Sequence, residues 1–267
     1  MKRFHLASLA TAMTMALALT AGLVSAAAPA ADDSAPASAA YVIPSGTPAY
    51  IAKAVGSDAR GADAKARDAA RKPAELLTLS GVKPGEKIVE FASFGQYFTT
   101  MLSDIAGPKG KVYMFDLPYT EKRAGDASRA FVAAHPNCEY TLVDYNKLEL
   151  PANADIVFNV LYYHDLYVND IDTASLNARI FKALKPGGIF FVVDHNAQAG
   201  SGTRDVKTLH RIDPAVIRKE VLAAGFELVS ESKLLARDSD DHTKIVFAPG
   251  LRGLTDQTVF KFRKPLH

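Results

Sequence analysis

Residues 87–116, KIVEFASFGQYFTTMLSDIAGPKGKVYMFD, alternate between the patterns of a strand, a helix and a second strand. Lys87–Phe91 is a short apolar run after a Pro-Gly turn and predicts a β-strand. Apolar side chains recur at helical spacing from Tyr97 to Ile105, and Lys111–Phe115 predicts a second strand that ends at Asp116. Short apolar strands that are separated by helices are typical of a parallel sheet.

The same alternation continues toward the carboxyl end of the chain. Further expected elements are the helix 127–134, the strand 139–143 before Asp144, the strand 155–161, the helix 175–184 and the strand 189–193 before Asp194. A helix that begins at Pro214 is followed by two strands, 227–235 and 258–262, without a helix between them. The sequence therefore predicts one α/β domain with a doubly wound, mostly parallel, seven-stranded Rossmann-like sheet and an antiparallel edge strand.

The first 40 residues differ in composition from the rest of the chain. A basic start, an apolar run to Val24 and small residues up to Ala26 predict a signal peptide over residues 1–26. An uncleaved anchor is the competing interpretation, because the apolar run is nearly long enough to span a bilayer. Residues 27–40, rich in Ala, Pro and Ser, predict a flexible linker, and residues 41–267 a single domain with a helical amino-terminal extension. We therefore expect a periplasmic or secreted protein with no stable membrane insertion after cleavage.

Composition and charge limit the possible partners. The chain has 267 residues, of which 48% are hydrophobic and 22% charged, as in ordinary globular proteins. Without Lys2 and Arg3 the 31 basic side chains fall to 29, which equals the number of acidic ones. A neutral chain lacks the basic face that nucleic-acid binding requires, so a small-molecule substrate is expected. The single cysteine, Cys138, predicts a buried structural thiol, and nothing in the residues specifies an oligomeric state.

Three acidic residues stand at the ends of three successive strands: Glu90, Asp116 and Asp144. In doubly wound folds, ligands bind at the carboxyl ends of the strands. Asp116 is placed to accept two ribose hydroxyls, much as the acidic residue does in dinucleotide sites. Carboxylates are also common at strand ends because loops are solvated, so each one alone is a weak signal.

Several segments carry a resemblance to a known family. They are Ile88–Leu102, Gly107–Tyr113, the turn Leu184–Gly188, Asp194-His195-Asn196, Gly200–Gly202, Leu209–Asp213 and Asp241–Lys244. From about Ile51 onward the chain resembles the class I S-adenosylmethionine-dependent methyltransferases, and more narrowly an exported bacterial group described as predicted methyltransferases. The resemblance implies S-adenosylmethionine as cofactor, held by Glu90, Ala92, Gly95, Asp116 and Asp144. With this cofactor, Glu90 is placed to meet the amino-acid end and Asp144 to hold the adenine amine.

The loop after the first strand departs from the pattern of that family. Phe94 and Gln96 stand where glycines are expected, and only Gly95 remains. Glycine allows close backbone approach and positive φ without steric cost. Bulky side chains here either occlude the cofactor pocket or fold outward as a lid, and the sequence leaves both possibilities open.

The residues expected to carry chemistry follow the fourth and fifth strands. His164 and Asp165 follow one, and Asp194 and His195 follow the other. Methyl transfer needs an oriented nucleophile and a base, and histidine titrates near neutral pH. A single histidine is more often a hydrogen-bonded structural residue, but four of them, with His210 and His242 included, lie near an aspartate in expected loops. Such clusters can also bind a divalent metal, but the spacing is not a zinc signature, so no metal is predicted.

Two functions remain open from the sequence. The first is a methyltransferase that acts on a small molecule in the cell envelope. The second is a catalytically inactive methyltransferase-like protein that binds a ligand or partner through the same cleft. The direction in which Phe94 points distinguishes them.

Overall fold

The computed structural model describes residues 40–266. The expected signal peptide and residues 27–39 of the expected linker lie outside the described residues, as does His267. Between residues 40 and 266, none of the helices combines the length and apolar character needed to cross a bilayer.

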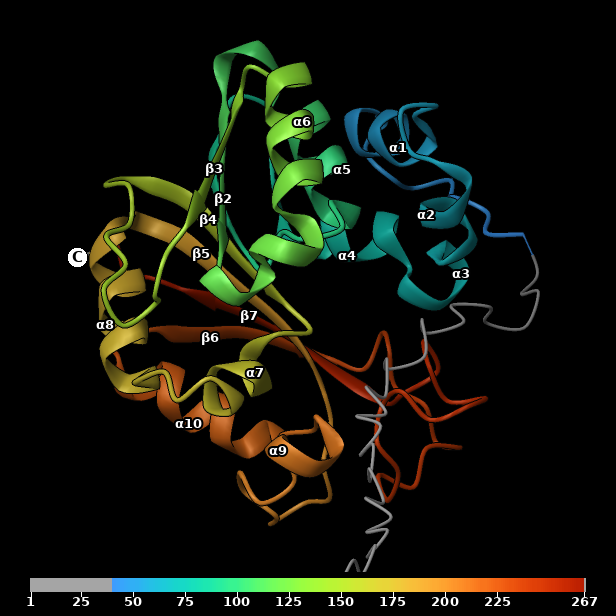
Figure 1. The fold of residues 1–267 in the computed structure, drawn as a ribbon, viewed down its shortest axis with the longest axis vertical. Helices are drawn as coiled ribbons and strands as arrows, with labels where there is room; N and C mark the ends of the chain where they lie inside the picture. Colours follow the sequence, from blue (N-terminus) through green and yellow to red (C-terminus); the bar gives the residue numbers. More distant parts are fainter. Residues whose placement is uncertain (1–39, 267) are drawn as a thin grey trace, which may run out of the picture. The chain divides into compact units, whose positions relative to one another are not determined.

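A seven-stranded sheet forms the centre of the described structure (Figure 1). Its strands are β1 (Lys87–Phe91), β2 (Lys111–Asp116), β3 (Cys138–Leu142), β4 (Ala154–Val160), β5 (Leu184–His195), β6 (Glu227–Ser232) and β7 (Gln257–Arg263). They lie in the order β3-β2-β1-β4-β5-β7-β6. β1 to β5 pair in parallel, and β7 runs antiparallel to both β5 and β6. The predicted Rossmann-like fold class is confirmed, with the antiparallel strand one place in from the edge.

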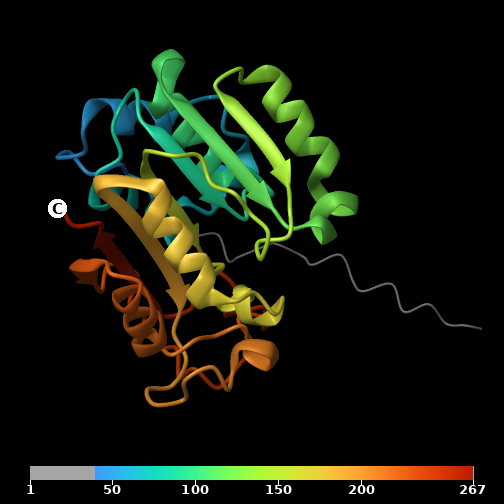
Figure 2. The ribbon, with the colours of Figure 1, turned by 90° about the vertical axis from the view of Figure 1, so that its left-hand side faces the viewer.

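Helices cover both faces of this sheet (Figure 2). The α-helices are α1 (Ala49–Gly56), α2 (Ala62–Ala66), α3 (Asp68–Arg71), α4 (Pro73–Ser80), α5 (Tyr97–Ala106), α6 (Asp126–Ala134), α7 (Tyr163–Val168), α8 (Thr173–Ala183), α9 (Val206–Leu209) and α10 (Pro214–Ala223). Short 3₁₀ turns at 107–109 and 118–120 and a π turn at 121–125 complete the connections. One core holds side chains of α1, α4 and α5, and the other holds side chains of α7, α8 and α10.

Strand register brings the carboxyl ends of β1, β2, β4 and β5 to one edge of the sheet. Phe91 of β1 pairs with Phe115 on one side and Asn159 on the other, and Asn159 pairs with Val192 of β5. The residues that follow these strands therefore meet at one edge, as the sequence predicts.

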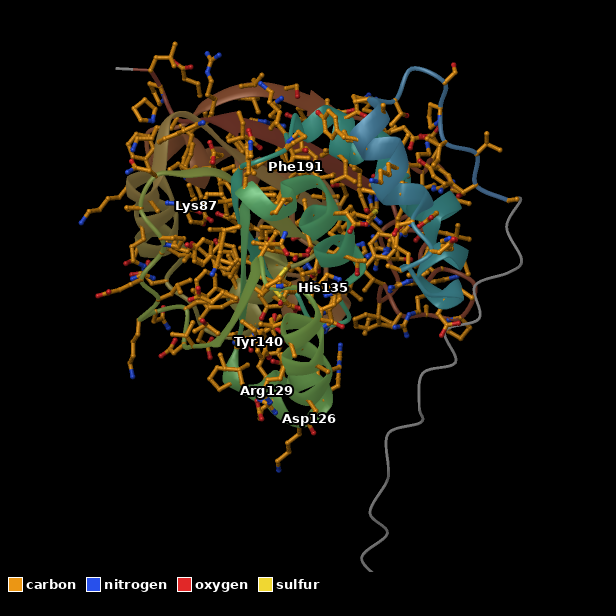
Figure 3. The ribbon with its side chains drawn as sticks, turned by 90° about the horizontal axis from the view of Figure 1, so that it is seen from above. Lys87, Asp126, Arg129, His135, Tyr140 and Phe191 are labelled. Atoms are coloured by element: carbon orange, nitrogen blue, oxygen red, sulfur yellow. The ribbon has the colours of Figure 1, made fainter. Side chains whose placement is uncertain are left out.

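The charged run from Arg60 to Lys72 in the amino-terminal extension contains a buried ion pair. Arg60 and Asp68 form a bidentate pair at 2.5 and 2.8 Å, and both are buried. Tyr97 of α5 donates its hydroxyl to Asp68 at 2.6 Å, so the run packs against the domain. By contrast, Asp126 and Arg129 form a solvent-facing pair on α6, the arrangement expected of a helical charge pair (Figure 3). Cys138 is buried, as predicted.

Two local elements also differ from expectation. Tyr163–Val168 forms the helix α7 where a loop was expected, so His164 and Asp165 lie in a first helical turn. β5 begins at Leu184 rather than at Ile189, and a register shift against β4 accommodates the Lys-Pro-Gly-Gly segment.

Candidate functional site

The loop after β1 follows a backbone path that usually needs glycine. Ala92, Gly95 and Gln96 have φ values of 55°, 85° and 48°, in the left-handed region. A Cβ added at position 95 would have no atom of the described residues within 4 Å, so the backbone there faces open space. The loop thus keeps a glycine-like course although two of these positions carry side chains.

Glu90 and Asp116, at the ends of β1 and β2, are buried carboxylates with an unsatisfied oxygen each. Among residues 40–266, Oε2 of Glu90 and Oδ2 of Asp116 find no hydrogen-bond partner. Burial raises the pKa of Glu90 to about 8, and the nearby charge of Asp116 adds to the rise. Burial also raises the pKa of Asp116 to about 6, against hydrogen bonds that lower it, including those from Ser93 and the Phe94 N–H. These two oxygens, at adjacent strand ends, are available for hydrogen bonds with a bound ligand.

Phe94 and Gln96 point in different directions. The Phe94 ring meets the Tyr162 ring edge-on with centroids 6.3 Å apart, and the Arg123 guanidinium lies 4.8 Å from its centroid. Gln96 instead donates its side-chain amide to the Ser128 hydroxyl of α6 at 2.9 Å. Phe94 therefore lies on the β4 side of the loop, whereas Gln96 is drawn toward α6.

Aromatic side chains line the space beside Phe94. Tyr162 also lies edge-on to Tyr145, with centroids 6.1 Å apart, and its hydroxyl is 3.3 Å from that of Tyr119. Tyr145 is fully buried and donates to the Phe115 carbonyl at 2.6 Å. These rings form a continuous wall from the β1 loop to the start of α7.

Asp144 makes its contacts within its own turn. Its Oδ1 accepts the Asn146 N–H at 2.9 Å, and Lys147 lies 3.9 Å from its other oxygen. These bonds explain why an acidic residue follows β3, and its expected contact with an adenine amine stays a prediction.

The four residues expected to carry chemistry gather around the buried carboxylate of Asp194. Asp194 accepts the His164 backbone N–H at 2.6 Å and contacts the His164 ring Nδ1 at 2.7 Å. It also accepts the His195 N–H at 2.8 Å, and the two histidine rings are 5.7 Å apart. Asp165 lies on the other side of the His164 ring, with its Oδ1 3.3 Å from Nε2. His210 joins this group through a 3.1 Å contact from its Nδ1 to Asp165.

The two central histidines differ in protonation. Burial works to lower the pKa of His164, but the charges and hydrogen bonds of Asp194 and Asp165 outweigh it and raise that pKa to about 10. Burial lowers the pKa of His195 well below its usual range, and the positive charge of His164 lowers it further. His164 is thus an imidazolium at neutral pH and His195 is neutral.

A buried network beyond β5 holds this cluster in place, and sequence reasoning did not single it out. Arg211 is fully buried and forms two 2.9 Å bonds to Asp240. His195 contacts the Thr255 hydroxyl at 2.7 Å. The 3.0 Å contact between Asp256 and His242 is partly exposed and is not part of this buried network. Arg211 lies in the Leu209–Asp213 segment singled out above. Its partner Asp240 is 29 residues further along the chain, and no sequence pattern links the two.

Comparison with protein families and curated relatives agrees with this geometry. The model of the ubiE/COQ5 methyltransferase family matches residues 69–203. A ubiquinone/menaquinone biosynthesis C-methyltransferase UbiE from Pasteurella multocida is 29% identical over 119 residues, 44% of this chain and 43% of the relative. The protein of that description from Saccharophagus degradans is 23% identical over 187 residues, 69% of this chain and 67% of the relative. The chain thus spans about two fifths to two thirds of the length of these relatives.

Solved structures share the fold at low identity. A SAM-dependent methyltransferase from Aquifex aeolicus has a TM-score of 0.52 and 16% identity, covering 71% of this chain and 88% of that one. The [4+2]-cyclase SpnF has a TM-score of 0.54 and 16% identity, covering 79% and 86%. At such identity the likeness establishes the fold, which has hosted more than one kind of chemistry.

Proposed function

Because the chain belongs to the ubiE/COQ5 methyltransferase family, we propose that it transfers a methyl group from S-adenosylmethionine to a small molecule. The reaction would take place where β1, β2, β4 and β5 end. The observation that carries the proposal is the pair of unpartnered, buried oxygens on Glu90 and Asp116. The signal predicted from residues 1–26 supports placing this activity in the cell envelope.

The residues at this edge fit the polar parts of the cofactor. Asp116 at the end of β2 offers an acceptor for ribose hydroxyls, and Glu90 offers a carboxyl oxygen for a hydrogen bond with the amino-acid end of the cofactor. The left-handed backbone at Ala92 and Gly95 keeps the path of a cofactor-binding loop. The Phe94 side chain must swing away from Tyr162 to admit an adenosyl group, because its ring lies on that side.

Each residue of the site has a separate role in the proposed methyl transfer. The cofactor, when bound, supplies an electrophilic methyl group on a sulfonium. His195 is neutral and takes the proton that an acceptor loses, while the 2.7 Å contact of its Nδ1 with the Thr255 hydroxyl orients the ring. Asp194 fixes the backbone of both His164 and His195, and Tyr162 supplies an apolar wall that excludes water.

Calorimetric titration of the purified chain without residues 1–26 tests this function. We expect saturable binding of S-adenosylmethionine, and weaker binding by Asp116→Asn, which keeps the shape of the side chain but loses its charge. Asp126→Asn, at an exposed position on α6, is the control for a loss of negative charge away from the Glu90–Asp116 pair. The absence of heat and of any thermal shift at millimolar cofactor in the wild-type chain would leave the proposal without support.

A ligand-binding protein that has lost methyl transfer is the second candidate. The position of Phe94 against Tyr162 favours it, because aromatic bulk occupies the side of the loop where the cofactor is expected. The two candidates differ in one outcome: the wild-type chain of such a binding protein would not bind S-adenosylmethionine, and binding that appears only in Phe94→Gly would show that the ring blocks the site.

A further inference from the structure

Three side chains near the end of β4 bring metal-ligating atoms together. His164 and Asp165 lie in the first turn of α7, and His210 follows α9. One ligand atom from each lies within 4.8 Å of the other two. Asp165 Oδ1 is the shared centre, 3.3 Å from His164 Nε2 and 3.1 Å from His210 Nδ1. Small side-chain adjustments can therefore place the three atoms around a single ion.

The donor set selects a class of cation. Two imidazole nitrogens and one carboxylate oxygen suit Zn²⁺ and similar divalent transition metals, whereas Mg²⁺ and Ca²⁺ prefer oxygen ligands alone. Two histidines and one carboxylate also form a known catalytic zinc set, with the remaining position left to water or substrate.

Asp194 supplies an independent observation that points to a ligand on His164. A histidine that ligates a metal through one ring nitrogen usually donates the N–H of the other to a carboxylate, carbonyl or water, and this hydrogen bond fixes the ring orientation and its tautomer. The His164 Nδ1 lies 2.7 Å from Asp194 Oδ1, and Asp194 is fully enclosed. With Nδ1–H committed to Asp194, the lone pair of a neutral His164 is at Nε2, on the side of Asp165 and His210. A metal ion would take the place of the proton that Nε2 otherwise shares with Asp165.

One side of the cluster is open to solvent. The His164 side chain is 3% exposed, whereas those of Asp165 and His210 are 19% and 24% exposed. An ion held here would have protein on the His164 side and solvent near His210, where the Phe247 ring lies 5.0 Å from the imidazole. That geometry leaves a coordination position for water or for an oxygen of a bound molecule.

We propose that His164, Asp165 and His210 form a binding site for Zn²⁺ or a related divalent transition metal, with Asp194 as the outer partner of His164. The ring centroids of His164 and His195 are 5.7 Å apart, so the metal site is next to the residue that we assign as the base. Metal binding does not depend on methyl transfer, so it can be tested without cofactor or acceptor.

A second His–Asp pair in the same chain provides a matched control. His242 Nε2 lies 3.0 Å from Asp256, with side chains 25% and 17% exposed, which closely matches the His210–Asp165 pair. Among residues 40–266, however, this second pair does not belong to a group of three converging ligand atoms.

The test is metal titration of the untagged chain after treatment with a chelator. Zn²⁺ content is measured by mass spectrometry after dialysis, and the visible spectrum of bound Co²⁺ reports on its coordination. We expect about one ion per chain, with affinity lowered at least about 100-fold by His210→Ala and by Asp165→Asn, and about 10-fold or more by Asp194→Asn. His242→Ala should bind metal as the wild type does.

Several outcomes would overturn the site. The wild-type chain without saturable binding of Zn²⁺ or Co²⁺ would do so by itself, whatever the variants do. Equal affinities for His210→Ala and His242→Ala would do so as well. Circular dichroism confirms that each variant is folded, and His210→Gln replaces His210→Ala if the smaller side chain disturbs the loop. Loss of S-adenosylmethionine binding with intact metal binding would reject the proposed methyl transfer and leave the metal site standing.

Discussion

The ring of Phe94 meets the ring of Tyr162 edge-on, with 6.3 Å between the centroids, where β1 and β4 end. Phe94 occupies a loop whose backbone keeps left-handed φ values at Ala92, Gly95 and Gln96. The loop backbone therefore keeps the path of a cofactor-binding turn, while the Phe94 ring occupies the space between the loop and Tyr162. Because the Phe94 N–H bonds Asp116, we expect the Phe94 ring to limit access to that carboxylate.

Replacing Phe94 by glycine should strengthen S-adenosylmethionine binding. The change removes a ring that otherwise must leave Tyr162 before the cofactor can enter, and we expect a gain of about 10-fold in affinity, or about 1.4 kcal/mol. Calorimetric titration of both chains measures it. Gln96→Gly is the control, because that side chain bonds Ser128 and leaves the Tyr162 side of the loop unaffected. Equal gains from both variants would show that loop flexibility, not the ring, limits binding.

Ionisation of Glu90 should make stability depend on pH. Its pKa rises from 4.5 to about 8 in the folded chain, so the folded state prefers the protonated form. The stabilisation is fully present below the unfolded pKa of 4.5 and is lost as pH rises toward 8. Glu90→Gln cannot ionise, so its free energy of unfolding relative to wild type should improve by on the order of 3 kcal/mol between about pH 5 and about pH 9.

Urea unfolding of wild type and Glu90→Gln at the two pH values measures this difference. Glu149→Gln, at an exposed position after β3, should show no comparable change with pH. A difference between wild type and Glu90→Gln that stays constant across the range would contradict an ionising, buried Glu90.

The sequence predicted the sheet well because strand and helix periodicity are local signals. The strands at 87–91, 111–116 and 154–160 lie within one residue of their expected ends, since apolar runs between Gly-Pro turns leave little choice. The position of β7 between β5 and β6 could not be derived from periodicity, because strand order depends on which edge is free for pairing.

The sequence predicted most of the residues of the site, but not the contacts between them. His164, Asp165, Asp194 and His195 were expected together because parallel strands end at one edge of the sheet. His210 enters through a loop 45 residues away from Asp165, and no local spacing predicts a contact at that separation. The opposite protonation states of His164 and His195 follow from burial and from carboxylate contacts, which only the folded arrangement determines.

Removing the charge of Asp194 should destabilise the whole end of β5. Its carboxylate accepts two backbone N–H groups and faces the His164 ring in the interior. In Asp194→Asn the amide NH₂ must face one of these donors, so we expect a loss of about 3 kcal/mol in the free energy of unfolding. Asp144→Asn, in a half-exposed turn, should change stability by less than about 1 kcal/mol. Urea titrations with a chelator present compare the two, and similar losses would mean that Asp194 is not a structural centre.

The buried ion pair of Arg211 and Asp240 should be the main anchor of the segment between β6 and β7. Arg211 is fully buried, makes two 2.9 Å bonds to Asp240 and also donates to the carbonyls of Asn196 and Lys244. Arg211→Met leaves Asp240 as an unpaired buried charge, which costs about 3 to 5 kcal/mol. Arg218→Met removes a guanidinium that forms a similar pair with Glu231, but both of these side chains are about one-third exposed, so the loss should stay below about 1 kcal/mol.

Hydrogen exchange should also become faster between residues 237 and 256 in Arg211→Met alone, because Asp240 accepts the N–H groups of His242 and Asp256 in that segment. Unchanged exchange there, with stability equal to that of Arg218→Met, would show that other contacts hold the segment against β5.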